Sequence, residues 1–184
     1  MEIFLAGIIQ GSIAEERIHR QDYRDRLKRT LRQALPAAEL FCPIENHPDS
    51  LGYSFDKGRD VFRFLIDKAV TCDVLLAFIP EASMGTAIEM WEAYNSGRLV
   101  IAISPLKKNW AVKFLSHHIF GTLDEFEEFV VSGGLRELID KHYGPEGSVK
   151  CEEDGEGRKE EEPHAETRSR GAAEEREGRE ENDE

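Results

Sequence analysis

The sequence predicts an α/β fold built on a doubly wound parallel sheet, and three observations support this. Short apolar segments alternate with amphipathic helical segments from the N-terminus to about residue 142. The apolar segment 74–79 contains no polar residue, as expected for a central parallel strand covered on both faces. The connections between the apolar segments are long enough to be helical crossovers, which parallel strands require.

Each element follows from its local pattern. Strands are expected at 3–6, 39–42, 74–79, 99–103 and 119–120. Helices are expected at 21–35, 57–71, 85–95, 110–115, 122–131 and 135–142, while the turn-forming residues of 43–53 predict a polar loop. About five parallel strands in this succession predict a flavodoxin- or Rossmann-like sheet.

The net charge of −13 is concentrated at the C-terminal end of the chain. Residues 148–184 contain 15 acidic and 7 basic residues, and very few apolar ones that a core could bury. This composition predicts a disordered acidic tail at 148–184, after a single folded domain at 1–147.

Composition also argues against several classes of function. The basic residues of 17–32 alternate with acidic and apolar ones, which is typical of a solvated helix face, so we expect no nucleic-acid binding. The three cysteines are too scattered for a disulfide framework or a zinc site, and buried free thiols are the simpler interpretation. We expect no metal, no other cofactor and no membrane span, and a cytoplasmic location.

The segment from Asp73 to Glu89 contains the strongest functional signal. Pro80 ends the apolar run, Ser83 is a candidate N-cap, and Gly85 allows an anion to approach the start of a helix. Glu89 then lies about one turn into that helix, near the carboxyl edge of the sheet. An acid early in a helix also has a structural explanation, because it complements the helix dipole.

Other residues leave two interpretations open. The glycine-flanked loop 7–12 would either line a ligand pocket or serve as a turn. Apolar Ile88 and Trp91 suggest that the helix carrying Glu89 is packed, which would keep its carboxylate from water. The pair His117 and His118 is expected to flank a strand, with one ring buried and one exposed, rather than to act chemically.

The segment from Asp73 to Pro80, followed by Ser83-x-Gly85-x-x-x-Glu89, resembles the nucleoside 2-deoxyribosyltransferase family, including its 2′-deoxynucleoside 5′-phosphate N-hydrolase branch. The likeness covers about the first 125 residues, and the Ser-x-Gly-x-x-x-Glu spacing is its specific part. The Gly85-Thr86-x-x-Glu89 pattern is also similar, more weakly, to nucleotide-monophosphate phosphoribohydrolases of the "lysine decarboxylase" type.

This resemblance implies an N-glycosidase, either hydrolase or base transferase, that acts on a nucleoside 5′-monophosphate and forms a homodimer. It implies that Glu89 is the nucleophile that attacks the anomeric carbon, since a fixed carboxylate suits an oxocarbenium-like transition state. Ser83 and Gly85 would hold the 5′-phosphate. The other implied substrate-binding residues are Gly7, Ile9 and Gly11 beside the sugar and phosphate, and Asn46 or His47 beside the base.

The sequence departs from the family at one position. Members carry an Asp eight residues before the Asp that opens the third strand, and here that position is Leu65. Asp67 and Asp60 both lie off the helix face of Leu65, but Asp60 is in the first turn of the helix, nearer the active edge of the sheet. Asp60 is therefore the candidate for assisting the leaving group. The alternatives are a nucleotide-binding sensor or interaction module with weak or no catalysis, and a purely structural module.

Overall fold

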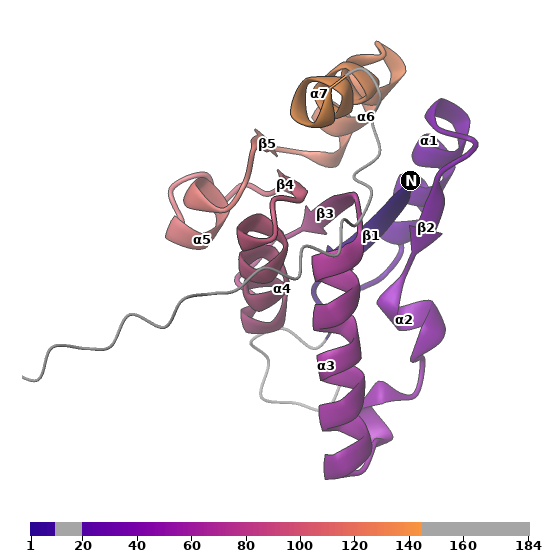
Figure 1. The fold of residues 1–184 in the computed structure, drawn as a ribbon, viewed down its shortest axis with the longest axis vertical. Coiled ribbons are helices and arrows are strands. Elements are labelled where there is room, and N and C mark those ends of the chain that lie inside the picture. Colours follow the sequence, from indigo (N-terminus) through magenta and orange to yellow (C-terminus); the bar gives the residue numbers. More distant parts are fainter. Residues whose placement is uncertain (10–19, 145–184) are drawn as a thin grey trace, which may run out of the picture. The chain divides into compact units, whose positions relative to one another are not determined.

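The computed structural model describes residues 1–9 and 20–144, which form one parallel sheet with helices on both faces (Figure 1). The five strands have the order β2-β1-β3-β4-β5, which confirms the predicted flavodoxin-like sheet. Their bounds are Glu2–Gly7 (β1), Glu39–Phe41 (β2), Val74–Phe78 (β3), Leu99–Ile103 (β4) and His118–Phe120 (β5). Each lies within one or two residues of its predicted position.

The strand order reverses between β1 and β3, and this determines where a ligand can bind. The chain moves from β1 outward to β2 and then returns to β3 on the other side of β1. Gly7 at the end of β1 pairs with Phe78 at the end of β3, so both strands finish at the same edge. Doubly wound sheets bind ligands in the crevice outside the carboxyl ends of such a strand pair.

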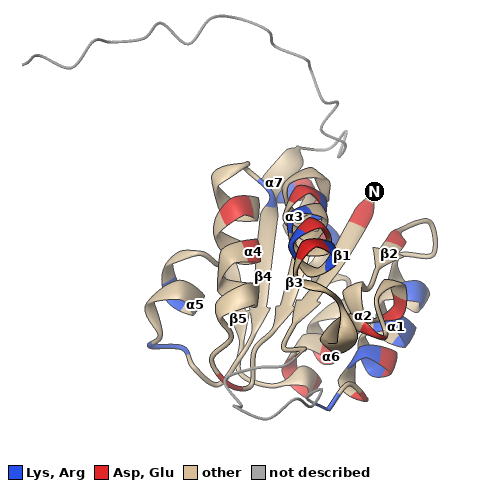
Figure 2. Cartoon of the chain, turned by 90° about the horizontal axis from the view of Figure 1, so that it is seen from below, with Lys and Arg blue, Asp and Glu red and all other residues tan. Residues whose placement is uncertain are grey.

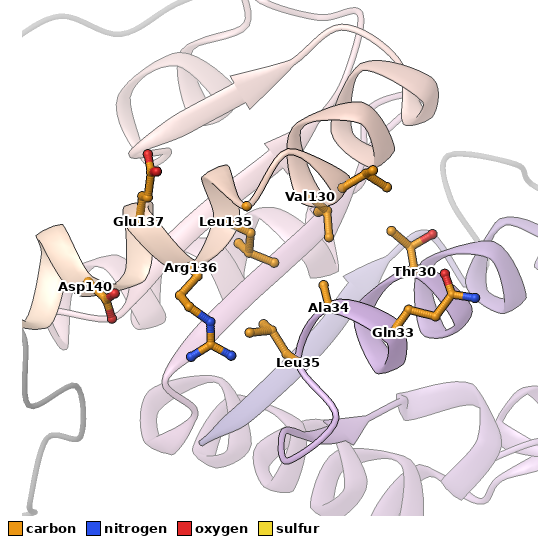
Figure 3. Close-up of a pocket in the computed structure, with 11 residues that line it drawn as sticks. Thr30, Gln33, Ala34, Leu35, Val130, Leu135, Arg136, Glu137 and Asp140 are labelled. Atoms are coloured by element: carbon orange, nitrogen blue, oxygen red, sulfur yellow. The ribbon is translucent and has the colours of Figure 1, made fainter.

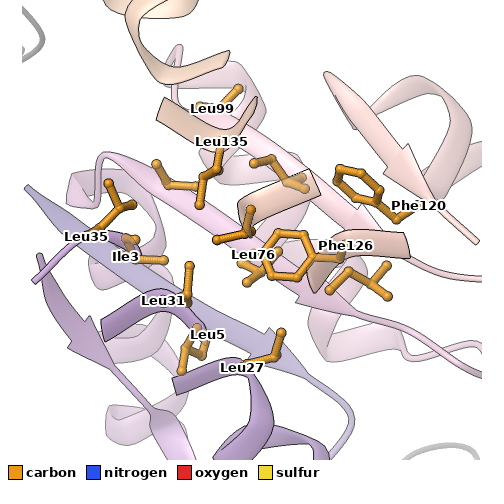
Figure 4. Close-up of a cluster of buried hydrophobic side chains, with 14 of the residues drawn as sticks. Ile3, Leu5, Leu27, Leu31, Leu35, Leu76, Leu99, Phe120, Phe126 and Leu135 are labelled. Atoms are coloured by element: carbon orange, nitrogen blue, oxygen red, sulfur yellow. The ribbon is translucent and has the colours of Figure 1, made fainter. Parts of the chain in front are cut away.

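Three helices cover one face of the sheet: α1 (Tyr23–Ala34), α6 (Leu123–Val131) and α7 (Gly134–Tyr143). Leu27 and Leu31 of α1 lie four residues apart and are fully buried, as their helical spacing predicts. They meet Leu76 of β3 and Phe126 of α6 in one apolar cluster (Figure 4). This core fixes α1 across β1 and β3.

The other face is covered by α3 (Phe55–Thr71), α4 (Met84–Asn95) and α5 (Trp110–Phe114). Phe4 of β1, Leu75 of β3 and Met90 of α4 belong to a second apolar cluster there. Both β3 and β4 alternate their side chains between the two clusters, which explains why neither strand contains a charged residue (Figure 2). Cys42 and Cys72 are buried free thiols, as predicted.

Residues 43–53 differ from the polar loop that their turn-forming composition predicted. A single helical turn, α2 (Pro43–Asn46), and a 3-10 turn, η1 (Ser50–Gly52), occupy this stretch. Pro43 is the first residue of α2, where its missing N–H costs no hydrogen bond, and the side-chain amide of Asn46 donates to the Cys42 carbonyl at 2.9 Å. The segment is therefore ordered by its own local hydrogen bonds.

Candidate functional site

Helix α4 begins at the carboxyl edge of β3, with Ser83 as its N-cap. The Ser83 hydroxyl accepts a hydrogen bond from the Thr86 backbone N–H at 3.4 Å and another from the Thr86 hydroxyl at 3.0 Å. The predicted cap is therefore confirmed. An added Cβ at Gly85 would meet no atom within 4 Å, so the helix start has open space in front of Gly85. Its first N–H groups lack helical acceptors and attract negative charge.

Glu89 lies on the buried side of α4, with only 8% of its surface exposed. Thr86, Met90 and Ala93 share that side, at the spacing of one helical face. Burial raises the pKa of Glu89 from 4.5 to about 8, and the positive charge of Arg24 opposes the rise. Burial therefore favours the protonated form of the Glu89 carboxyl group, while the charge of Arg24 favours its ionised form.

The apolar residues that suggested burial of Glu89 are themselves exposed. Ile88 is 43% exposed and Trp91 is 54% exposed, on the side of α4 that faces away from the sheet. The inference that Glu89 avoids water is right, but its stated reason is wrong. The buried stripe of α4 runs through Thr86 and Met90, and Glu89 lies within it.

Tyr23, at the start of α1, reaches the end of β1. Its ring stacks on Phe78 with centroids 4.0 Å apart. A Cβ at Gly7 would overlap the Tyr23 hydroxyl and lie 3.2 Å from the Phe78 carbonyl oxygen, so glycine permits this close approach. The Tyr23 hydroxyl is buried and has no hydrogen-bond partner within the described part of the chain. Burial raises its pKa to about 12, and Glu89 contributes to that rise.

Arg24 is a buried cation, only 2% exposed, beside Tyr23. Its Nε donates to the Gln21 side-chain oxygen at 2.6 Å, and its Nη1 donates to the Leu5 carbonyl at 2.6 Å and to Cys42 Sγ at 3.7 Å. Its Nη2 is buried with no partner among the residues that the structure describes. Two buried polar atoms at the start of α1, one on Tyr23 and one on Arg24, thus have no hydrogen-bond partner within the described ranges.

The sequence interpretation missed both residues. It assigned the basic residues of 17–32 to a solvated helix face, and for Arg24 that assignment is wrong. The signal was available, since Arg24 precedes Leu27 by three residues and Leu31 by seven, which places it on the apolar stripe of α1. An arginine on such a stripe must find partners inside the protein.

A hollow of about 470 Å³ lies at the carboxyl edge of the sheet, beside the start of α1. Apolar and aromatic groups form much of its lining, including Tyr23, Phe78 and Ile103, with Arg20 and Arg26 also in its wall. A smaller hollow of about 190 Å³ adjoins Ser83 and Met84, between α4 and α5. The smaller hollow therefore adjoins the start of α4, whereas the larger one lies beside Tyr23 and Phe78, and Glu89 lines neither of them.

Among the predicted base-contacting residues, His47 is held between aromatic rings. Its ring is in edge contact with Tyr53 and Phe64, and its Nδ1 lies 3.3 Å from the Tyr53 hydroxyl. The Nε2 atom of His47 is buried and has no partner within the described ranges. Asn46 is exposed, and its amide nitrogen is already used in the bond to Cys42 that orders α2.

The remaining predicted residues divide into three groups. Gly7 and half-buried Ile9 lie at and just beyond the end of β1, as expected. Gly11 lies outside the described residues. Asp60 is exposed on α3, whereas Leu65 is 7% exposed and belongs to the core cluster with Ala69 and Met90. The position where a family Asp was expected therefore contributes to packing.

The histidine pair stands apart from this site. The His117 and His118 rings differ from the expected one-buried, one-exposed arrangement: His118 is half-buried against Phe129, and exposed His117 contacts His142. No cluster of three or more histidine, cysteine or acidic side chains that could hold a metal occurs among residues 1–9 and 20–144. No helix within those ranges is long and apolar enough to cross a membrane.

A further groove, of about 560 Å³, separates α1 from α6 and α7 (Figure 3). Apolar Ala34, Leu35, Val130 and Leu135 face one another across it, and the charged side chains of Arg136 and Asp140 lie beside them. Leu35 immediately follows α1, so this groove extends toward the amino edge of the sheet, away from Glu89. It has no buried acid or base in its lining.

Comparison with solved structures identifies proteins of the same architecture. A 2-deoxyribosyltransferase from Bacillus psychrosaccharolyticus is 23% identical, with 69% of this chain and 90% of that one covered at a TM-score of 0.53. The chain has the fold of a 2-deoxyribosyltransferase. A conserved protein from Enterococcus faecalis is 19% identical over 72% of this chain and 98% of that one, with a TM-score of 0.51.

A CMP N-glycosidase from Clostridium botulinum is also 19% identical, over 72% of this chain and 99% of that one, with a TM-score of 0.44. No model of a protein family matches the sequence. No curated protein matches it either. The likeness to the 2-deoxyribosyltransferase and to the Enterococcus faecalis protein establishes the fold, and activity must be argued from the residues of this chain.

Proposed function

We propose that the protein is an N-glycosidase that cleaves the bond between base and sugar in a nucleoside 5′-monophosphate. The observation that carries the proposal is the buried carboxyl group of Glu89 at the edge where β1 and β3 end. A buried acid with a raised pKa is costly to the fold, and such groups concentrate at functional sites. The fold shared with a 2-deoxyribosyltransferase makes glycosyl chemistry the natural assignment.

In the proposed reaction, the ionised Glu89 carboxylate attacks the anomeric carbon of the sugar. The bond between carbon and base nitrogen breaks, and the base leaves with the bonding electrons and takes up a proton. Water then attacks the anomeric carbon of the glycosyl ester, which releases the sugar phosphate and restores the Glu89 carboxylate. A second base in place of water would give transfer. The negative charge of Glu89 also stabilises the positive charge that develops on the sugar.

The start of α4 is the proposed site for the 5′-phosphate. A Cβ at Gly85 would meet no atom within 4 Å, so an anion can approach there, and the N–H groups at a helix start favour negative charge. Ser83 caps α4 and Glu89 lies six residues further along the chain, and in the proposed complex one nucleotide has its phosphate at the helix start and its sugar beside Glu89. His47, with an unpaired Nε2 between two aromatic rings, supports a role in contacting the base.

Base release from nucleotides tests the proposal directly. The purified protein is incubated with ribo- and deoxyribonucleoside monophosphates, and free base is measured by chromatography. We expect release from at least one of them and loss of release in Glu89→Gln. Glu92→Gln, which changes an acid one turn further along α4, is the matched control and should remain active. Full activity in Glu89→Gln, or no release from any nucleotide, contradicts the proposal.

A second candidate function is nucleotide sensing without turnover. The specific observation in its favour is the packing of Leu65 in the core, at the position where an acid was expected, while Asp60 is exposed. Saturable nucleotide binding without base release over hours would support this candidate. Substitution Asp60→Asn separates the two ideas further, because we expect it to slow base release only if Asp60 assists the leaving group.

We also propose that the protein is a homodimer, through the outer surface of α3, α4 and α5. Large apolar side chains are exposed on all three helices: Phe62 and Phe64 on α3, Ile88, Trp91 and Tyr94 on α4, and Trp110 and Phe114 on α5. Exposed apolar groups at this density are typical of contact surfaces. Sedimentation should give a dimer for the native chain and a monomer for Trp91→Glu, and a native monomer contradicts this assignment.

A further inference from the structure

His117 stands immediately before β5 and pairs with one residue of β4 through both its backbone and its ring. Its backbone N–H donates to the Val100 carbonyl oxygen at 2.8 Å, and the Val100 N–H donates to its ring Nδ1 at 3.0 Å. A backbone N–H can only donate, so Nδ1 carries a lone pair and the neutral ring holds its proton on Nε2. The imidazole therefore serves as the acceptor that a further strand residue would have supplied.

This pair of hydrogen bonds closes the amino end of a short ladder. Strand β5 is the edge strand of the described sheet, and its three residues pair with β4 from Ile101 opposite His118 to Ile103 opposite Phe120. Val100, one residue before that ladder, is fully buried, so its N–H has no water to bond in the closed fold. The ring of His117 is thus the group that satisfies it on the β5 side.

The last turn of α7 holds the same end of β4. His142 Nε2 lies 3.0 Å from the Gly97 carbonyl oxygen, which only accepts, so this nitrogen carries a proton. The Tyr143 hydroxyl accepts from the Leu99 N–H at 3.1 Å. The His142 and His117 rings are in edge contact, with centroids 4.6 Å apart. Two histidines in contact therefore bond to the backbone here, one as a donor and one as an acceptor.

Protonation affects these two histidines differently. A second proton on His142 would occupy Nδ1 and leave the bond from Nε2 to Gly97 in place. A second proton on His117 has only Nδ1 to occupy, where it would face the Val100 N–H. Two donors would then point at each other, and the buried N–H would lose its acceptor.

We propose that His117 is an acid-sensitive clasp between β4 and β5, closed while its ring is neutral and opened by protonation at Nδ1. Opening would release the amino end of β5 from β4 and expose the Val100 N–H to water. The clasp lies at the amino edge of the sheet, where β4 begins, whereas Glu89 lies near the carboxyl edge. It is therefore independent of the proposed glycosidase activity.

The charges around the clasp set its direction. The ionisable side chains at this end of β4 are Asp73 before β3, Tyr94 of α4, Arg98 before β4, His118 of β5, and His142 and Tyr143 of α7. Burial of the ring, and then the charge of His142, lower the pKa of His117 from its usual value. The closed clasp thus binds the proton more weakly than the open one. It is stable above about pH 6.5 and loses stability as the pH falls below that value.

Hydrogen exchange of the Val100 amide in the full chain tests the clasp. Protection, corrected for the intrinsic exchange rate, is measured by NMR from pH 5 to pH 8, together with the ring nitrogen signals of His117. We expect a neutral ring protonated on Nε2, and protection that falls about tenfold between pH 7.5 and pH 5 as the ring titrates. Constant protection, or a neutral ring protonated on Nδ1, overturns the proposal.

Substitution by asparagine removes the titration and keeps the acceptor. In His117→Asn the side-chain oxygen takes the place of Nδ1, so we expect Val100 protection that does not depend on pH. His118→Asn, at the neighbouring histidine, is the matched control and should retain the wild-type fall. A fall in His117→Asn as large as in wild type overturns the proposal. If His117→Asn does not fold, the wild-type measurement decides by itself.

A second substitution tests the contact between the two rings. His142→Gln removes the charge, while its side-chain amide can still donate to the Gly97 carbonyl oxygen. We expect the titration midpoint of His117 to rise, and the fall in Val100 protection to begin at a higher pH. A midpoint that stays the same would show that His142 does not act on the clasp.

Discussion

At the scale of single residues, Glu89 combines deep burial with an ionisable group, and this has a consequence for stability. Its pKa is about 8 in the folded protein, against 4.5 for an exposed glutamate. Between these values the folded state binds a proton that the unfolded state releases. The stability contributed by protonated Glu89 is therefore complete below pH 4.5 and is lost as pH rises toward 8.

Replacing Glu89 by glutamine should accordingly stabilise the protein at high pH. The free energy of unfolding of Glu89→Gln, measured by urea denaturation, should exceed that of wild type by a few kcal/mol at pH 8, since each pH unit across the window contributes about 1.4 kcal/mol. The difference should shrink toward zero at pH 5. Glu92→Gln serves as the control and should show no such trend. A Glu89→Gln variant that is less stable at pH 8 would contradict the assigned burial.

The contact between Gly7 and Tyr23 gives a second prediction at this scale. Gly7→Ala introduces a methyl group that overlaps the Tyr23 hydroxyl, so the free energy of unfolding should fall by about 1–3 kcal/mol. Adding Tyr23→Phe removes that oxygen and should restore part of the loss, which a double-mutant cycle measures. Additive effects of the two substitutions would show that the hydroxyl does not lie over Gly7.

At the scale of elements, Ser83 at the start of α4 is both a structural cap and part of the proposed phosphate site. Helix α6, which also has a side-chain cap, is the control that distinguishes the two roles. Ser83 caps α4, and Thr122 caps α6 through the Glu125 backbone N–H at 3.1 Å. Ser83→Ala and Thr122→Ala should each lower stability by about 1 kcal/mol. Only Ser83→Ala should also weaken the binding of nucleoside monophosphates in calorimetry. Equal binding by both variants would remove Ser83 from the phosphate site.

Local sequence patterns predicted most of the helices and strands, because backbone preferences determine where these elements form. The apolar run 74–79 and the cap at Ser83 required no knowledge of the rest of the chain. Arg24 and Leu65 show where such reasoning fails. Each lies on a helix face that the sequence predicts. Only the packing of α1 against β1 shows that Arg24 is buried with hydrogen-bond partners, and only the packing of α3 against α4 shows that Leu65 belongs to the core.

At the scale of the whole molecule, the expected division at residue 147 separates a domain with two apolar clusters from a segment rich in charge. Every residue of both clusters lies between Ile3 and Tyr143. A chain ending after Gly147 should therefore melt cooperatively, with a Tm within a few degrees of the full-length protein, because it keeps every residue of the two clusters. Calorimetry checks this, and a broad or absent transition would place essential contacts within 148–184.

The sequence by itself determined the doubly wound sheet, the capped helix start at Ser83 and the position of Glu89, because periodicity and capping depend on neighbours along the chain. Tertiary structure alone decided the chemical setting of Glu89. The exposure of Ile88 and Trp91, the packing of Leu65, and the approach of Tyr23 and Arg24 from α1 all depend on which helix faces meet across the sheet. The pKa of a carboxyl group depends on burial and on charges near it in space. The raised pKa of Glu89, which the charge of Arg24 opposes, therefore follows from tertiary packing and not from the order of residues along the chain.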